Sequence, residues 1–177
     1  MIGSGHVDPR LLAVLPARPE LLVLDFDGVM TDNAVYVGED GRESVRCSRG
    51  DGMGISLLRK AGLSVLVLST ETNPVVQARC RKLGIECING LEDKEAIFRR
   101  ILMERSIASA NTIYVGNDVN DIGCLRLAGC ALVVADAHPA VLEVADYVLS
   151  RPGGQGAVRE VCDALIAHLR WNAQKAA

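Results

Sequence analysis

The sequence predicts an α/β fold, a doubly wound parallel sheet with helices on both faces. Short apolar runs at 21–24, 65–68 and 112–115 have the length and composition of strands buried on both sides. Segments with helical spacing separate these runs, and polar or acidic residues follow several of them. Alternation of strands with helices of this length specifies a parallel sheet built from crossover units.

Size and composition favour a single globular domain. The chain has 177 residues, of which 49% are hydrophobic and 23% charged, enough to bury a core. A net charge of −3 argues against a nucleic-acid partner. The six cysteines form no Cys-x-x-Cys pair, and only three histidines are present, so we expect free thiols in a reducing compartment. No secretory signal or membrane-length apolar run occurs, which predicts a soluble, cytoplasmic protein without a membrane partner.

Glycine, proline and capping residues mark the expected ends of the helices and strands. Residues 1–20 are rich in Gly and Pro, so we expect a loose lead-in with one helical turn near Leu11. The segments 34–37 and 43–47 flank a Gly-containing loop and predict a small β-hairpin flap. Asn73 is expected to cap a helix that has Pro74 at its first position. Helices are predicted over 51–61, 74–83, 92–105, 122–128, 139–144 and 157–170, and further strands over 85–88, 131–134 and 147–149. One domain then spans 21–170, followed by a tail at 171–177.

Two acids close the first strand. Asp25 and Asp27 follow the apolar run 21–24, and Gly28 comes next. Side-chain alternation places the two carboxylates on the same side if the chain stays extended. Close carboxylates repel each other unless a cation or a shared proton relieves them. An Asp-x-Asp-Gly segment alone fits a solvated turn equally well.

Further polar residues stand at other strand ends and at one helix start. Loops after parallel strands meet at one edge of the sheet, so these groups are expected to share a pocket with the two acids. Carboxylates hold Mg²⁺, while a lysine and a hydroxyl bind phosphate oxygens. One aspartate is then available as a nucleophile and another as an acid and base. The additional residues are Ser69, Thr70, Glu71, Lys94, Asn117, Asp118 and Asp121.

The segment Asp25-Phe26-Asp27-Gly28-Val29 resembles the first motif of the haloacid dehalogenase superfamily, the aspartate-nucleophile phosphatases. Ser69, Lys94 and the loop 116–121 match the second, third and fourth motifs, in order, over about 21–165. The resemblance implies that Asp25 is the nucleophile and a metal ligand. It also implies that Asp27 is the acid/base and gives its backbone carbonyl to Mg²⁺, and that Ser69 and Lys94 hold the phosphoryl group.

The fourth motif departs from the family pattern. Many relatives begin it with Gly-Asp-Asp, whereas this chain has Gly116-Asn117-Asp118. Asn117 offers a neutral carbonyl oxygen, which implies weaker binding of Mg²⁺. Alternatively, Asp118 or Asp121 takes part directly or through water, or catalytic power has been lost. The intact nucleophile, acid/base, hydroxyl and lysine positions favour a catalytic site.

The layout leaves no room for a separate cap domain, because only the hairpin and one helix lie between Asp27 and Ser69. This resembles the phosphatases of 3-deoxy-2-keto sugar acid phosphates, namely octulosonate 8-phosphate and nonulosonate 9-phosphate. It also resembles the phosphatase-like domains of acylneuraminate cytidylyltransferases. Segments 135–139 and 153–160 share this likeness. The resemblance implies a homotetramer in which a neighbouring subunit closes each active site and excludes water.

Three residues bear on the substrate. Relatives acting on the octulosonate tend to carry Thr-Gly-Arg after the second strand, whereas this chain has Ser69-Thr70-Glu71. Glu71 and Lys82 resemble the nonulosonate enzymes, which favours a nonulosonate 9-phosphate as substrate, with Thr70 also in contact with it. Glu71 and Lys82 equally fit a pair of solvated charges that flank a helix.

Two other functional classes stay open. Asn117 is compatible with the first of them, a catalytically weak module that forms a tetramer and supports a nucleotide-sugar pathway. A receiver domain with a phosphorylatable aspartate is disfavoured, since receivers lack the paired acids followed by glycine. Smaller features are ambiguous: Arg46 and Arg49 either meet an anionic substrate or lie at the surface, and His138 is expected to cap a helix. The run 153–156 fits an anion site or a turn, and Trp171 fits an anchor between subunits.

Overall fold

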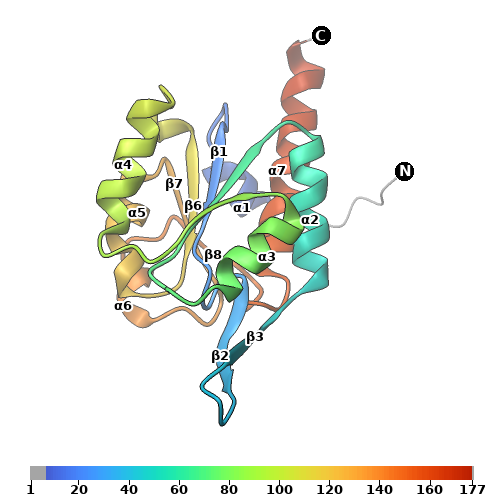
Figure 1. Ribbon diagram of the computed structural model, residues 1–177. Coiled ribbons are helices and arrows are strands. Elements are labelled where there is room, and N and C mark those ends of the chain that lie inside the picture. Colours follow the sequence, from blue (N-terminus) through green and yellow to red (C-terminus); the bar gives the residue numbers. More distant parts are fainter. Residues whose placement is uncertain (1–6, 177) are drawn as a thin grey trace.

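A six-stranded parallel sheet forms the centre of the computed structural model, which describes residues 7–176 (Figure 1). The strand order is β5-β4-β1-β6-β7-β8, so β1 lies between β4 and β6 and the winding reverses there. This is the switch point at which doubly wound sheets bind ligands. The strands are β1 (Leu21–Leu24), β4 (Ser64–Leu68), β5 (Glu86–Ile88), β6 (Thr112–Gly116), β7 (Cys130–Val133) and β8 (Tyr147–Val148).

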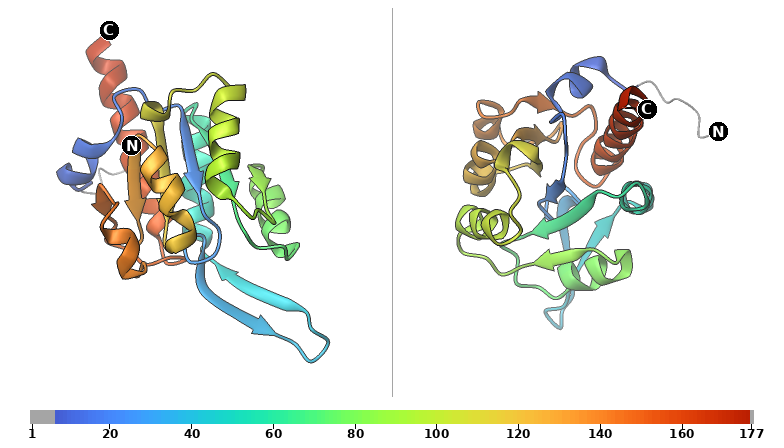
Figure 2. Two further views of the ribbon diagram at one scale, coloured as in Figure 1. Left: turned by 90° about the vertical axis from the view of Figure 1, so that its left-hand side faces the viewer. Right: turned by 90° about the horizontal axis from the view of Figure 1, so that it is seen from above.

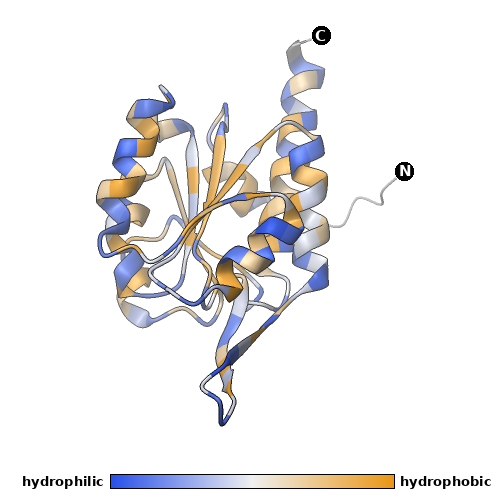
Figure 3. Ribbon diagram, in the orientation of Figure 1, coloured by the Kyte–Doolittle hydropathy of each residue, from blue (hydrophilic) through white to orange (hydrophobic). Residues whose placement is uncertain are grey.

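Helices cover both faces of the sheet (Figures 1 and 2). Alternate side chains of each strand enter opposite cores, as Leu22 and Leu24 do on one face and Leu21 and Val23 on the other. Both cores are apolar, and the sheet in Figure 3 is correspondingly coloured as hydrophobic. The first face carries α1 (Pro9–Val14), α2 (Arg49–Lys60), α3 (Val75–Leu83) and α7 (Ala157–Ala176), and the second α4 (Lys94–Glu104), α5 (Ile122–Leu127) and α6 (Pro139–Leu142).

Capping residues set the helix ends. The hydroxyl of Ser48 accepts from the N–H of Asp51 at 3.2 Å, so α2 begins two residues before the predicted start. Asp93 accepts from the N–H of Ala96 at 2.9 Å and makes Lys94 the first residue of α4. His138 caps α6 as predicted, with Nδ1 accepting from the N–H of Ala140 at 3.2 Å.

The structure differs from the sequence prediction in both terminal segments of the chain. Residues 1–6 and 177 lie outside the described residues. The remainder of the lead-in is not loose, because α1 buries Leu11 in the core. The tail is not separate either, since α7 continues to Ala176 with no glycine or proline to end it. His168 Nε2 lies 3.0 Å from the carbonyl of Pro16, and Asn172 donates to the carbonyl of Ala17 at 2.9 Å.

The hairpin of β2 (Thr31–Val37) and β3 (Glu43–Cys47) projects from the body of the molecule (Figure 2). β2 begins three residues earlier than predicted, and an irregularity between Thr31 and Val35 shifts its register. The hairpin is the only insertion between β1 and α2, so the described chain has no separate cap domain. Its apolar residues Val35, Tyr36 and Val37 are exposed.

Two further observations bear on the predicted class of protein. Within residues 7–176, no helix is both long and apolar enough to cross a membrane. All six cysteines are free thiols, four of them buried and two half-buried.

Candidate active site

The loop after β1 brings Asp25 and Asp27 to one cavity. The backbone turns tightly there, because the carbonyl of Phe26 accepts from the N–H groups of Met30 at 2.9 Å and Thr31 at 3.1 Å. Gly28 is required at the turn: its φ is +77°, and a Cβ there would lie 2.0 Å from the amide of Asn117.

A cavity of about 250 Å³ opens at the carboxyl edge of β1, β4 and β6. Six of the residues that the sequence predicted for the site line this cavity, namely Asp25, Asp27, Ser69, Thr70, Asn117 and Asp118. The others that line it are Asn33, Val119 and Asn120. The predicted convergence of the strand ends is therefore present in the structure.

A buried ion-pair network lies beneath the cavity. Lys94 Nζ is 2.7 Å from Asp25 Oδ1 and 2.8 Å from Asp121 Oδ1, and the lysine is only 3% exposed. Tyr114 donates its hydroxyl proton to Asp121 Oδ1 at 2.7 Å, and the N–H of Asn117 donates to Oδ2 at 2.9 Å. Asp121 therefore holds Lys94 and the fourth-motif loop in place. It does not line the cavity, so the alternative of a direct metal ligand at Asp121 does not fit this geometry.

Burial and charge set the protonation states of this network. Burial, aided by the charge of Asp121, raises the pKa of Asp25, and the Lys94 ammonium, paired with it at 2.7 Å, opposes this rise and favours the carboxylate. Burial alone would lower the pKa of Lys94, but the carboxylates of Asp25 and Asp121 outweigh it and raise that pKa. Burial also raises the pKa of Tyr114 well above its ordinary value, so the phenol keeps its proton as a donor.

Asp27 lies in a different environment. Partial burial raises its pKa, and the nearby charge of Glu71 raises it further. The hydroxyl of Thr31, 3.5 Å from Asp27 Oδ1, acts in the opposite direction. A raised pKa favours the protonated acid, which is the form that a general acid needs.

The side-chain amide of Asn117 meets oxygen atoms of Asp25 and Asp27 at one point of the cavity. One atom of the Asn117 amide lies 3.2 Å from Asp25 Oδ2 and 2.9 Å from the carbonyl oxygen of Asp27. With the amide oxygen in that place, all three groups are acceptors and none supplies a proton. Adjacent oxygens around an octahedral Mg²⁺ lie about 2.9 Å apart, given bond lengths of ~2.0–2.1 Å. With the amide turned over, its NH₂ donates to the same two oxygens.

This set of oxygens suits a hard cation. Its members are a carboxylate, a backbone carbonyl and an amide, with no nitrogen or sulfur. The structure, over its described residues, contains no group of three or more His, Cys, Asp and Glu side chains arranged for a metal. Binding at this position therefore depends on the neutral oxygens of Asn117 and Asp27 as well as on Asp25. Asp118 lines the same cavity, where its Oδ1 accepts from the N–H of Val119 at 2.7 Å.

The residues predicted to choose the substrate lie at the rim or outside it. The buried hydroxyl of Ser69 accepts from the N–H of Glu71 at 3.1 Å. Glu71 turns back into its own loop, where Oε1 accepts from the N–H of Asn73 at 2.7 Å. Lys82 is exposed on α3, and neither it nor Glu71 lines the cavity. Thr70 does line it, and its hydroxyl accepts from Asn120 Nδ2 at 3.4 Å.

Sequence reasoning missed three residues of the rim, namely Asn33, Val119 and Asn120. Asn120 and Val119 belong to the acidic loop, whose position could have drawn attention to them. Asn33 has φ of +60°, a conformation that the residue type alone does not predict. Of the two arginines left open, Arg46 pairs with Asp32 at 2.8 Å, and neither lines the cavity.

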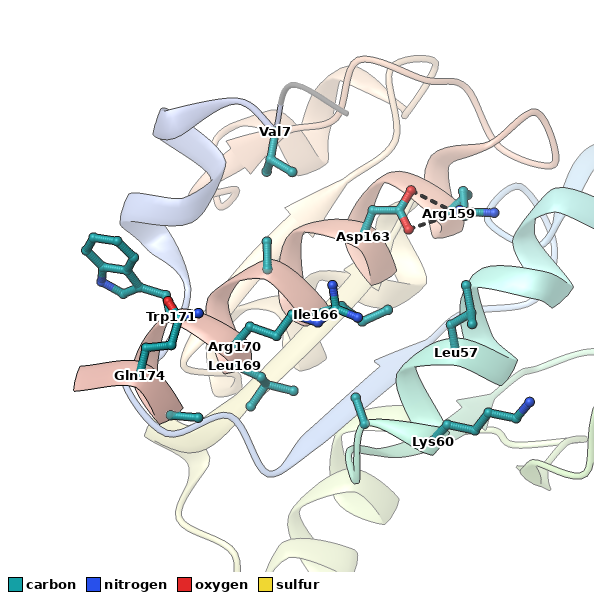
Figure 4. Close-up of a pocket in the computed structure, with 13 residues that line it drawn as sticks. Val7, Leu57, Lys60, Arg159, Asp163, Ile166, Leu169, Arg170, Trp171 and Gln174 are labelled. Carbon is teal, nitrogen blue, oxygen red and sulfur yellow. Dashed lines mark hydrogen bonds and ion pairs between the residues drawn. The ribbon is translucent and has the colours of Figure 1, made fainter. Parts of the chain in front are cut away.

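A larger hollow of about 890 Å³ lies between α2 and α7, away from the strand ends (Figure 4). Apolar residues such as Leu57, Ile166 and Leu169 line it, together with Trp171. Its one ion pair among the labelled residues joins Arg159 and Asp163 at 2.8 Å. This surface has no pair of acids beside a lysine, so size alone does not make it the reaction site.

A buried aspartate paired with lysine, beside a second acid at the switch point of a doubly wound sheet, is the arrangement expected of an aspartate-nucleophile hydrolase. The model of the haloacid dehalogenase-like hydrolases matches residues 78–160. The 3-deoxy-D-manno-octulosonate 8-phosphate phosphatase of Salmonella typhimurium is 39% identical over 92% of this chain and 86% of its own length. The chain therefore belongs to the haloacid dehalogenase superfamily, as a phosphatase of the octulosonate 8-phosphate phosphatase type.

Solved structures agree with this assignment. A HAD family hydrolase from Streptomyces avermitilis has a TM-score of 0.83 and 46% identity, covering 88% of this chain and 90% of that one. The Moraxella catarrhalis 3-deoxy-D-manno-octulosonate 8-phosphate phosphatase has a TM-score of 0.84 and 27% identity, covering 94% and 96%. That protein was solved in complex with a magnesium ion, a phosphate ion and a KDO molecule. The predicted fold and superfamily are confirmed.

Proposed function

We propose that this phosphatase hydrolyses the phosphate monoester of a 3-deoxy-2-keto sugar acid through an aspartyl-phosphate on Asp25. The observation that carries the proposal is the placement of Asp25, which bonds to Lys94 at 2.7 Å and lines the same cavity as Asp27 and Ser69. The substrate class is supported by the names of the Salmonella and Moraxella relatives.

The reaction has two steps on the residues of the cavity. In the first, a carboxylate oxygen of Asp25 attacks phosphorus, the bond to the ester oxygen breaks, and Asp27 gives its proton to the leaving alkoxide. In the second, the Asp27 carboxylate takes a proton from water, whose oxygen attacks phosphorus and restores Asp25. The products are the free sugar acid and inorganic phosphate. Ser69 and Lys94 bind the non-bridging oxygens throughout.

The convergent oxygens of Asp25, Asp27 and Asn117 would hold Mg²⁺. Bound there, the ion would neutralise part of the charge on the phosphoryl oxygens. The donor set and its 2.9 and 3.2 Å separations support this assignment. The magnesium ion in the Moraxella relative supports it as well. Because Asn117 contributes no formal charge, we expect the affinity for Mg²⁺ to be modest.

Within this substrate class, we propose a nonulosonate 9-phosphate ahead of an octulosonate 8-phosphate. The support is Glu71, which stands where octulosonate enzymes tend to carry arginine. Its charge raises the pKa of Asp27. Lys82 agrees in sequence but lies outside the cavity lining. The Salmonella relative is named for the octulosonate ester. Both esters therefore belong in the test.

We propose a homotetramer in which a neighbouring subunit closes the cavity. The described chain has no cap domain, and Asn33 of the projecting hairpin lines the cavity. The hairpin exposes Val35, Tyr36 and Val37, and Trp171 is 59% exposed on α7. Exposed apolar side chains of this number on a small protein are suited to contacts between subunits. A support module without catalysis is the second candidate, favoured only by Asn117.

The test is phosphate release with Mg²⁺ from both sugar-acid phosphates, comparing the native chain with Asp25→Asn. We expect turnover of at least one ester and a loss of at least about 1000-fold in the variant, because the amide is a poor nucleophile. Sedimentation of the same preparations gives the assembly state. A stable tetramer without phosphate release would contradict catalysis and favour the support module. Turnover by a monomer would contradict closure by a neighbour.

A further inference from the structure

Thr31 is a buried polar residue at the foot of the hairpin, 0% exposed, that no step above uses. Its hydroxyl oxygen accepts from the N–H of Gly28 at 3.1 Å and from the N–H of Asn33 at 3.2 Å. A hydroxyl has two acceptor sites and one proton. With both acceptor sites in use, the proton of Thr31 has to go to another acceptor, and Asp27 Oδ1 lies 3.5 Å away.

The backbone around Thr31 fixes this direction. Asn33 has φ of +60°, within a register shift of β2, and this turn brings its N–H back to Thr31. On the other side, the N–H of Gly154 donates to the carbonyl of Val29 at 3.0 Å. A Cβ at Gly154 would lie 2.5 Å from the carbonyl carbon of Thr31, so the 150–156 loop presses closely behind it. Thr31 therefore has little freedom to turn its hydroxyl away from Asp27.

We propose that Thr31 is a positioning residue for Asp27: its hydroxyl donates to Oδ1 and holds the carboxyl toward the cavity. The second oxygen, Oδ2, is then available for the proton that passes to the leaving group. This role rests on the proposed function of Asp27 as the acid and base. It also connects the hairpin to the acid/base residue, because β2 begins at Thr31.

The first test measures the geometry without turnover. Scalar couplings to the Asp27 carboxyl carbon report its χ1 rotamer, with Asp27→Asn to assign the signal. Thr31→Val keeps the shape and removes the hydroxyl, and Thr31→Ser restores it. We expect one dominant rotamer in the native chain and in Thr31→Ser, and averaging between rotamers in Thr31→Val, with and without Mg²⁺. A single unchanged rotamer in a folded Thr31→Val would overturn the proposal. These couplings decide the role of Thr31 even if the chain hydrolyses no sugar-acid phosphate.

The second test separates positioning from a merely structural role. The first step is followed in a single turnover with two kinds of leaving group. The alkoxide of a sugar-acid phosphate needs a proton, whereas the phenolate of p-nitrophenyl phosphate leaves without one. We expect Thr31→Val to slow alkoxide release about tenfold or more and phenolate release less than about twofold, since general acids contribute ~10²–10⁴-fold. Thr31→Ser should restore the alkoxide rate. Equal losses for both leaving groups would show that Thr31 only maintains the fold.

Discussion

The floor and the rim of the cavity are built in different ways. The floor consists of Asp25, Lys94, Tyr114, Asn117 and Asp121, which are buried and bonded to one another. The rim consists of Asn33, Thr70, Val119 and Asn120, with Glu71 beside it in the loop after β4, and few side-chain bonds hold these residues. A buried charge needs a fixed partner, whereas an exposed side chain is free to vary. We therefore expect the floor to support the reaction that the family shares and the rim to distinguish substrates.

The largest effect on stability is expected at Asp121 in the floor. Asp121→Asn removes the charge that Lys94 meets at 2.8 Å and replaces one acceptor oxygen with an NH₂ group. Breaking one partner of a buried ion pair costs about 3 kcal/mol. We expect the free energy of unfolding, measured with urea, to fall by that amount. Phosphatase activity should fall as well, because Asp121 holds Lys94 in place.

Glu104→Gln is a matched control, because it also removes the carboxylate from an ion pair with a basic side chain. Glu104 meets Arg100 at 3.7 Å, with both side chains more than half exposed. Exposed pairs contribute ~0–1 kcal/mol, so we expect a change below about 0.5 kcal/mol. Equal losses at Asp121 and Glu104 would contradict the distinction between the buried network of the floor and an exposed ion pair.

The next effect is expected at Asn117, where the floor meets the proposed cation site. Asn117→Asp adds a negative charge next to Asp25 Oδ2 and the carbonyl of Asp27. Without Mg²⁺ the new charge is repelled, so thermal stability should fall. With Mg²⁺ the charge becomes an additional ligand, and calorimetric titration should show binding about tenfold tighter.

Asn120→Asp is the control for Asn117→Asp, since it adds the same charge at the exposed rim of the same cavity. We expect its Mg²⁺ affinity to stay within about twofold of the native value. Equal tightening in both variants would show a general effect of charge rather than ligation. Unchanged affinity in Asn117→Asp would place the cation elsewhere.

The sequence predicted the floor better than the rim, and the reason is physical. Buried strands, the acids at their ends and a lysine at a helix start leave local patterns, so the sheet, Asp25 and Lys94 could be found. The anchoring of Lys94 by Asp121 could not, since it joins residues 27 positions apart. The conformation of Asn33 was also hidden, because a register shift in β2 depends on contacts across the hairpin.

Helix ends show the same division between local and tertiary causes. His138 was recognised as a cap because its partner lies two residues away. Helix α7 runs six residues beyond the predicted end, because bonds from His168 and Asn172 to the carbonyls of Pro16 and Ala17 support it. Those partners come from the other end of the chain, where no local pattern could indicate them.

The smallest effect is expected at Glu71, which lies beside the rim. Glu71→Gln keeps the acceptor for the N–H of Asn73 and removes the charge near Asp27. We expect an unchanged fold and a shift of at most about fivefold in the ratio of kcat/KM for nonulosonate over octulosonate esters, toward the octulosonate. The reason is that the charge of the half-buried Glu71 is partly screened by solvent, and five-fold is about 1 kcal/mol. Lys82→Gln is the control, because Lys82 is exposed and lies outside the cavity lining. Equal ratios in all three proteins would remove Glu71 from substrate choice and leave that choice to Asn33, Val119 and Asn120 or to a neighbouring subunit.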